Sequence, residues 1–137
     1  MNYYNVIGLL NTSMAAIFCV ALFAIWKNHR AFPYIATLSV SYATRSLCFG
    51  IFYFAFSMSD PVLRFSANVS LMLSMLLLSI GLSNRRRRRP RYAALLAIAA
   101  ITLGSLSYYQ FIEQNLLVRV IILNSGLALV SLLMLPD

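Results

Sequence analysis

The sequence predicts an all-α membrane protein: one bundle of about five transmembrane helices, with the N-terminus on the outer side of the membrane. Composition gives the first indication. Hydrophobic residues make up 61% of the 137 residues and charged residues 10%, against about 45–50% and about 25% in soluble domains. The mean hydropathy is +0.81. The sequence has only three acidic residues, Asp60, Glu113 and Asp137, which is too few for the surface of a soluble domain of this size.

Recurring apolar stretches give the second indication. A helix needs about 20 apolar residues to cross a hydrocarbon core of about 30 Å. Five stretches approach or exceed this length: Asn5–Trp26, Ala31–Phe56, Pro61–Leu82, Tyr92–Ile112 and Leu117–Leu135. The first lacks a basic segment before it and is longer than a signal-peptide core, so we expect a retained anchor. The whole range 1–137 is thus expected to form a single transmembrane domain.

The basic residues give the third indication, because short loops rich in Lys and Arg stay in the cytoplasm. Lys27 and Arg30 follow the first stretch, and a basic run follows the third, consisting of Arg85, Arg86, Arg87, Arg88, Arg89 and Arg91. The other two loops carry Asp60 and Glu113. All four loops agree with one topology, in which the basic loops are cytoplasmic.

The basic run has two compatible interpretations. It can act as a topology determinant alone, or it can also bind anionic lipid headgroups, each arginine near the surface contributing about 1 kcal/mol. We expect no binding of nucleic acid, because the run lacks interleaved aromatic residues and lies between two spans.

The sequence offers little for catalysis. It contains no H-E-x-x-H, G-x-S-x-G or C-x-x-C motif, and these are the patterns that would indicate a metal site, a serine nucleophile or a thiol oxidoreductase. The sole histidine, His29, falls in a short basic loop. We therefore expect no enzymatic activity, no cofactor and no bound metal. A proton-coupled carrier would need a carboxylate or histidine at membrane depth, and the predicted spans have none.

Polar residues gather in the outer half of the predicted spans, and these are the candidate binding residues. Arg45 lies about 16 Å into the second span at 1.5 Å per residue, where an arginine is expensive and indicates a functional site by default. The other candidates at the outer side are Asn11, Asn68, Asn124 and Arg119. Two interpretations remain open: an outward-facing pocket for a small anionic or carbonyl-bearing ligand, or polar contacts that only join the helices. We expect Arg45 to form one cluster with Asn68 and Asn124, and Asn11 beside them.

Small residues recur at four-residue spacing in two spans, which allows close approach of helices. They are Ser66, Ser70 and Ser74 in the third span, and Ala93, Ala97, Ala100 and Gly104 in the fourth. We expect both stripes to pack within the chain rather than to form a dimer face.

The pattern as a whole resembles the N-terminal membrane sensor regions of bacterial diguanylate cyclases, which carry a C-terminal Gly-Gly-Asp-Glu-Phe domain. The resemblance rests on Trp26-Lys27 closing the first span, on Arg45 in the second, on the basic loop Asn84–Pro90, and on Leu117-Val118-Arg119-Val120 opening the last. It covers nearly the whole chain as a pattern. The Gly-Gly-Asp-Glu-Phe motif itself does not occur in this sequence.

This resemblance implies a multi-pass input module in a bacterial inner membrane, which relays a ligand signal to a diguanylate cyclase-type domain further along the chain. The partners would be membrane lipids and a small anionic ligand, with a homodimer through the C-terminal part left open. The last span has no basic residue behind it before Pro136 and Asp137, so we expect a piece of a longer protein, although a terminal span can also end without an anchor. The alternative function is a stand-alone small transporter or an accessory membrane subunit.

Replacing Arg85 through Arg89 by serine is expected to disturb the orientation of the third and fourth spans, because it removes most of the cytoplasmic charge bias. Reporter fusions in the flanking loops measure the orientation. Replacement of the same five residues by lysine keeps the charge and is expected to keep the topology. An unchanged topology in the serine variant would show that the run has another role.

Overall fold

The computed structural model describes residues 3–58, 60–87, 89–113 and 115–134, and every regular element in these ranges is an α-helix. The five helices are α1 (Tyr3–Asn28), α2 (Pro33–Met58), α3 (Pro61–Arg85), α4 (Tyr92–Phe111) and α5 (Leu116–Leu132). The first four are long and apolar enough to cross a membrane. The predicted class, an all-α membrane bundle, is therefore confirmed.

The helices begin where local chemistry favours a start. Pro33 and Pro61 are the first residues of α2 and α3, where proline loses no intrahelical hydrogen bond. Asp60 caps α3 by accepting a hydrogen bond from the Val62 amide at 2.9 Å. Asn115 caps α5 in the same way through the Val118 amide at 3.3 Å.

The fifth helix is shorter than predicted. It ends at Leu132 after 17 residues, or about 25 Å at 1.5 Å per residue, and the chain turns at Leu133 and Met134. Leu135, the predicted end of this span, lies outside the described residues. The sequence predicted too late an end because the apolar composition continues after the helical hydrogen bonding stops.

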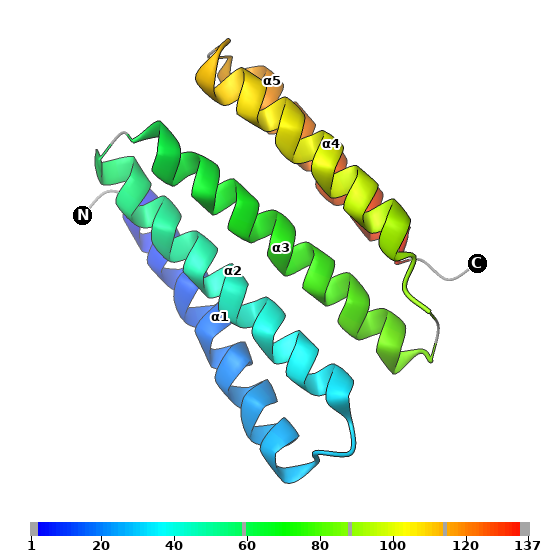
Figure 1. Ribbon diagram of the computed structural model, residues 1–137. Coiled ribbons are helices and arrows are strands. Elements are labelled where there is room, and N and C mark those ends of the chain that lie inside the picture. Colours follow the sequence, from blue (N-terminus) through cyan, green and yellow to red (C-terminus); the bar gives the residue numbers. More distant parts are fainter. Residues whose placement is uncertain (1–2, 59, 88, 114, 135–137) are drawn as a thin grey trace.

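The helices form two groups that meet at α3. Helices α1, α2 and α3 lie side by side in a row, and the α4–α5 hairpin lies on the other side of α3 (Figure 1). Among the described residues, α1 packs against α2 alone, and α4 and α5 pack only against each other and α3. We call the line along which the hairpin meets α3 the α3 seam.

Helix α2 is joined to α1 by two serine hydroxyl groups. The Oγ of Ser39 donates to the carbonyl of Cys19 at 3.0 Å, and the Oγ of Ser46 donates to the carbonyl of Thr12 at 3.2 Å. The two serines are seven residues apart and therefore share one face of α2. These bonds satisfy the serine hydroxyl groups in a region where water supplies no partners.

A second face of α2 is joined to α3 in the same manner. The Oγ of Ser41 donates to the carbonyl of Ser74 at 2.8 Å, and the Sγ of Cys48 donates to the carbonyl of Ala67 at 3.2 Å. Ser41 and Cys48 are also seven residues apart, and each follows one of the first two serines by two positions along α2. Small polar side chains on two faces of one helix thus hold three helices in a row.

The stripe of small residues on α4 was expected to pack against other helices of the chain, and it does not do so. Its members, Ala93, Ala97, Ala100 and Gly104, are all exposed, so that prediction is wrong. The buried face of α4 carries Leu95, Ala99, Thr102, Leu106 and Gln110 instead. The serine stripe of α3 is at least half-buried throughout, and Ser74 is fully buried. Alanine is compatible with either face of α4 because every face is apolar, and spacing alone did not fix the rotation of the helix.

Helices α4 and α5 approach each other closely at Gly126. A Cβ built there would lie 2.6 Å from the Cγ2 and 3.0 Å from the Cβ of Thr102. Thr102 is buried, and its β-branched side chain has few alternative rotamers. Glycine is therefore required at position 126 for the hairpin to close.

Gly126→Ala is expected to destabilise the protein by about 1–3 kcal/mol, because the added methyl group overpacks a fixed contact. Gly104→Ala is the matched control on α4: a Cβ at Gly104 meets nothing within 4 Å, and alanine improves helix propensity. Melting temperatures in detergent measure both. Adding Thr102→Ala to the first variant should recover part of the loss. Equal stability of the two single variants would contradict the close contact.

Candidate functional site

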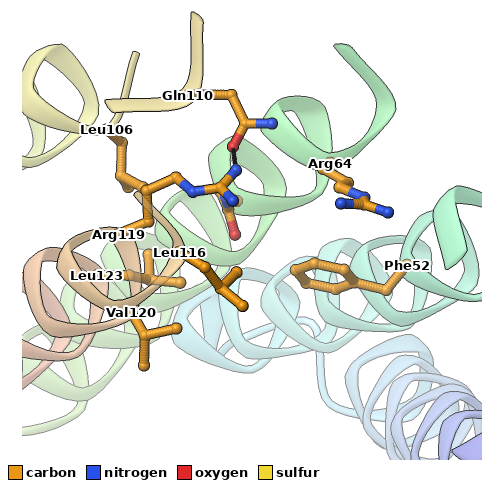
Figure 2. Close-up of a pocket in the computed structure, with 9 residues that line it drawn as sticks. Phe52, Arg64, Leu106, Gln110, Leu116, Arg119, Val120 and Leu123 are labelled. Atoms are coloured by element: carbon orange, nitrogen blue, oxygen red, sulfur yellow. Dashed lines mark hydrogen bonds between the residues drawn. The ribbon is translucent and has the colours of Figure 1, made fainter. Parts of the chain in front are cut away.

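A cavity of about 380 Å³ lies at the end of the bundle that holds the Asp60 and Glu113 loops. Its described lining comes from helices α2, α3, α4 and α5. The lining residues are Phe52 of α2, Arg64 and Asn68 of α3, Leu106 and Gln110 of α4, and Leu116, Arg119, Val120 and Leu123 of α5 (Figure 2). We call this space the seam cavity, because it opens along the α3 seam.

Helix ends place the charged residues of the cavity. Arg64 is the fourth residue of α3 and Arg119 is the fourth residue of α5, so both lie one turn inside a helix start. Their long side chains reach the same space from two different helices (Figure 2). Because the two helices start at the same end of the bundle, two guanidinium groups line one cavity.

Gln110 connects the hairpin to α3 beside this cavity. Its side chain is buried, and its Nε2 donates to the carbonyl of Pro61 at 3.2 Å. Its Oε1 accepts a hydrogen bond from Nη1 of Arg119 (Figure 2). One amide thus holds the first turn of α3 and the first turn of α5 at the end of α4. It also fixes the position of the Arg119 side chain.

The electrostatics of the cavity favour a negative group. Among the described residues, its lining has two guanidinium groups and two amides and no carboxylate. The Nε of Arg119 is buried and has no hydrogen-bond partner among the described residues. A guanidinium has five N–H donors and forms its strongest hydrogen bonds with carboxylate and phosphate oxygens. The cavity can therefore hold an anion, and the described residues include no His/Cys/Asp/Glu cluster suited to a metal.

The structure brings only part of the predicted site together. Asn68 and Arg119 line the seam cavity. Arg45 instead turns toward α3, where its Nη2 lies 3.0 Å from Sδ of Met75. Met75 is seven residues beyond Asn68, or about 10 Å along the helix. Arg45 is therefore not among the described residues that line the cavity, and its hydrogen bond goes to Met75.

The other two predicted residues also lie elsewhere. Asn124 is exposed on α5 and is not among the lining residues, although it lies one turn beyond Val120. Asn11 is half-buried on α1, and within the described residues this helix packs against α2 alone. The prediction placed Asn68 and Asn124 together by depth alone. Equal depth does not by itself bring residues of different helices into one cavity.

Sequence reasoning missed two polar residues of the cavity, Arg64 and Gln110, and all of its apolar lining. A signal for Gln110 was available: it stands nine residues before Arg119, across a short loop between two predicted spans. Such residues face each other at the end of a helical hairpin. The apolar residues gave no signal, because leucine and valine occur on every face of these helices.

The basic run lies at the opposite end of the bundle from the cavity. Its described members, Arg85, Arg86, Arg87, Arg89 and Arg91, are exposed, and Arg88 lies outside the described residues. Arg86 Nη1 donates to the carbonyl of Met134 at 2.7 Å. A cation beside the last carbonyl groups of a helix is favourable because of the helix dipole. The loop between α3 and α4 thus also contacts the end of α5.

Gln110→Met is expected to lower stability by about 1–3 kcal/mol, because the variant keeps the volume but leaves the half-buried Arg119 guanidinium without its acceptor. Ser107→Ala is the matched control: it lies one turn earlier on α4, and its hydroxyl bonds only to the carbonyl of Gly104 in the same helix. Melting temperatures in detergent compare the two. A Gln110→Met protein as stable as the control would show that the bond to Arg119 does not hold the hairpin.

The chain has no match among protein-family models, curated proteins or solved structures. The resemblance to membrane sensor regions therefore stays an expectation from the sequence pattern.

Proposed function

We propose that this chain is the membrane input module of a bacterial signalling protein. In this proposal it binds an anionic ligand in the seam cavity and relays binding to a diguanylate cyclase-type domain C-terminal to α5. The single observation that supports it best is the pair of arginines, Arg64 and Arg119, in a cavity whose described lining residues include no carboxylate. The output domain is the one implied by the sequence pattern.

The position of the cavity supports the relay. It lies between two parts of the bundle that meet only along α3. A ligand that contacts Arg64 on α3 and Arg119 on α5 would change how the α4–α5 hairpin sits against α3. Both helices continue to the opposite end of the bundle, where α5 ends at Leu132. A shift at the cavity would therefore reach the C-terminal end of α5.

The loop charges support the placement of the cavity on the outer side. The exposed cations Lys27 and Arg30 and the basic run lie at one end of the bundle, and short basic loops stay in the cytoplasm. The seam cavity lies at the other end. In this orientation the N-terminus is outside, the ligand enters from the outer surface of the inner membrane, and α5 ends toward the cytoplasm.

Distance measurements across the cytoplasmic end test the relay. Spin labels are placed at Asn84→Cys on α3 and Leu132→Cys on α5, both exposed, in a Cys19→Ser background; Cys48 is fully buried. Acetate, inorganic phosphate and decanoate serve as probe anions in reconstituted vesicles. At least one should shift the distance by about 1–2 Å, the usual size of a helix displacement in a switch.

Arg119→Gln should abolish this shift, and Lys27→Gln, which removes an equal charge at the other end, should preserve it. The absence of a shift with every probe anion would overturn the relay. Flux of the same labelled anion into the vesicles at a rate that depends on Arg119 would favour the alternative, a small transporter.

A further inference from the structure

The apolar walls of the seam cavity restrict the class of ligand further than its charges do. Most of the lining is apolar, with Phe52, Leu106, Leu116, Val120 and Leu123. Leu116 is 67% exposed and Val120 is 50% exposed, so the α5 wall is open at the surface of the bundle. In a membrane that surface faces lipid chains. The cavity therefore has a lateral opening beside its two arginines.

The size of the cavity exceeds what a small anion needs. Its volume is about 380 Å³, while a water molecule has a share of about 30 Å³ in the liquid. A phosphate or acetate ion between the arginines would leave the apolar walls without a partner. A hydrocarbon chain would cover them and would remove apolar surface from water near the membrane interface.

The charges around the cavity give no strong attraction for an anion dissolved in water. Asp60 and Glu113 lie in the two loops at the same end as Arg64 and Arg119, so two negative and two positive groups balance there. Asp60 is held at the start of α3 by its bond to the Val62 amide. An anion that is already in the membrane needs no such long-range attraction, because it can enter through the opening at α5.

The depth of the arginines fits a membrane amphiphile. Each lies one turn inside its helix start, about 5 Å along the axis, which is the level of lipid headgroups when the helix ends lie at the interface. Guanidinium groups form their strongest hydrogen bonds with carboxylate and phosphate oxygens, which acidic headgroups carry. The apolar wall of α5 spans about two turns from Leu116 to Leu123, and Leu123 lies about 6 Å deeper than Arg119.

We propose that the seam cavity binds an anionic amphiphile with a hydrocarbon chain, of the fatty-acid class. Its acidic headgroup lies between Arg64 and Arg119, and its chain passes Phe52 and the Leu116–Leu123 wall of α5. This inference rests on the proposed function for the use of the site, and it adds the class of ligand and the route of entry. Tight binding requires both the acidic headgroup and the hydrocarbon chain of the ligand.

Competition for a fluorescent fatty acid tests the proposal on the full chain in uncharged detergent. A dansyl-labelled undecanoic acid is the probe, and its emission rises when it enters an apolar site. Three competitors separate the contributions: decanoate has charge and chain, inorganic phosphate has charge alone, and decanol has the chain alone. Decanoate should displace the probe, and the other two should be at least tenfold weaker.

Variants locate the site. Arg64→Gln and Arg119→Gln should each weaken decanoate at least tenfold, and Leu123→Trp should do so by filling the apolar part. Lys27→Gln, distant from the cavity and exposed, should bind as the native chain does. Arg64→Gln keeps the test valid if loss of Arg119 disturbs the fold, because Arg119 is the one of the two arginines that bonds to Gln110. Elution in size-exclusion chromatography checks that each variant is folded.

The outcomes distinguish this inference from the proposed function. If phosphate competes as well as decanoate, the cavity selects a free anion, and the amphiphile is wrong while an anion-binding input module stands. If decanol competes as well as decanoate, the cavity binds chains without reading charge, and both proposals fail. Probe binding that none of the cavity variants weakens would place the amphiphile elsewhere and overturn the inference.

Discussion

Helices surrounded by hydrocarbon gain no hydrophobic energy by packing together, so close fit and interhelical hydrogen bonds must hold them. In this protein those bonds run from small side chains to backbone carbonyl groups. Ser39 and Ser46 join α2 to α1, and Ser41 and Cys48 join it to α3. Each bond satisfies a polar group where water supplies no partner. The row α1–α2–α3 depends on this arrangement, and it forms the fixed part against which the hairpin is set.

The hairpin is attached differently. Helices α4 and α5 close on each other at Gly126 and Thr102, and α3 contributes Met72 to the apolar core that they share. Their polar attachment at the cavity end is Gln110, which bonds both to the carbonyl of Pro61 and to Arg119. At the other end Arg86 bonds to Met134. A ligand bound in the seam cavity as proposed would contact the same residues that hold the two parts of the bundle together.

The sequence predicted the helices well and their rotations poorly. Length, hydropathy and proline positions gave five segments, because a membrane span needs about 20 apolar residues whatever its neighbours are. The same uniform composition hid which face of each helix is buried. Ala93 and Ala97 were expected inside and are exposed, and Asn124, expected beside Asn68, is exposed and does not line the cavity. Arg119 was found because it is charged. Gln110 was missed as a partner, because its role depends on which way α4 turns.

The length of α5 has a consequence for the membrane itself. Its 17 helical residues cover about 25 Å, against a hydrocarbon core of about 30 Å. A short apolar helix is accommodated when the surrounding bilayer thins or flanking residues extend to the interface. The strain of this mismatch falls on the one helix that supplies the open wall of the seam cavity. Hydrophobic mismatch therefore couples the position of α5 to lipid chain length, and bilayer thickness becomes a physical variable that acts on the same joint as a ligand.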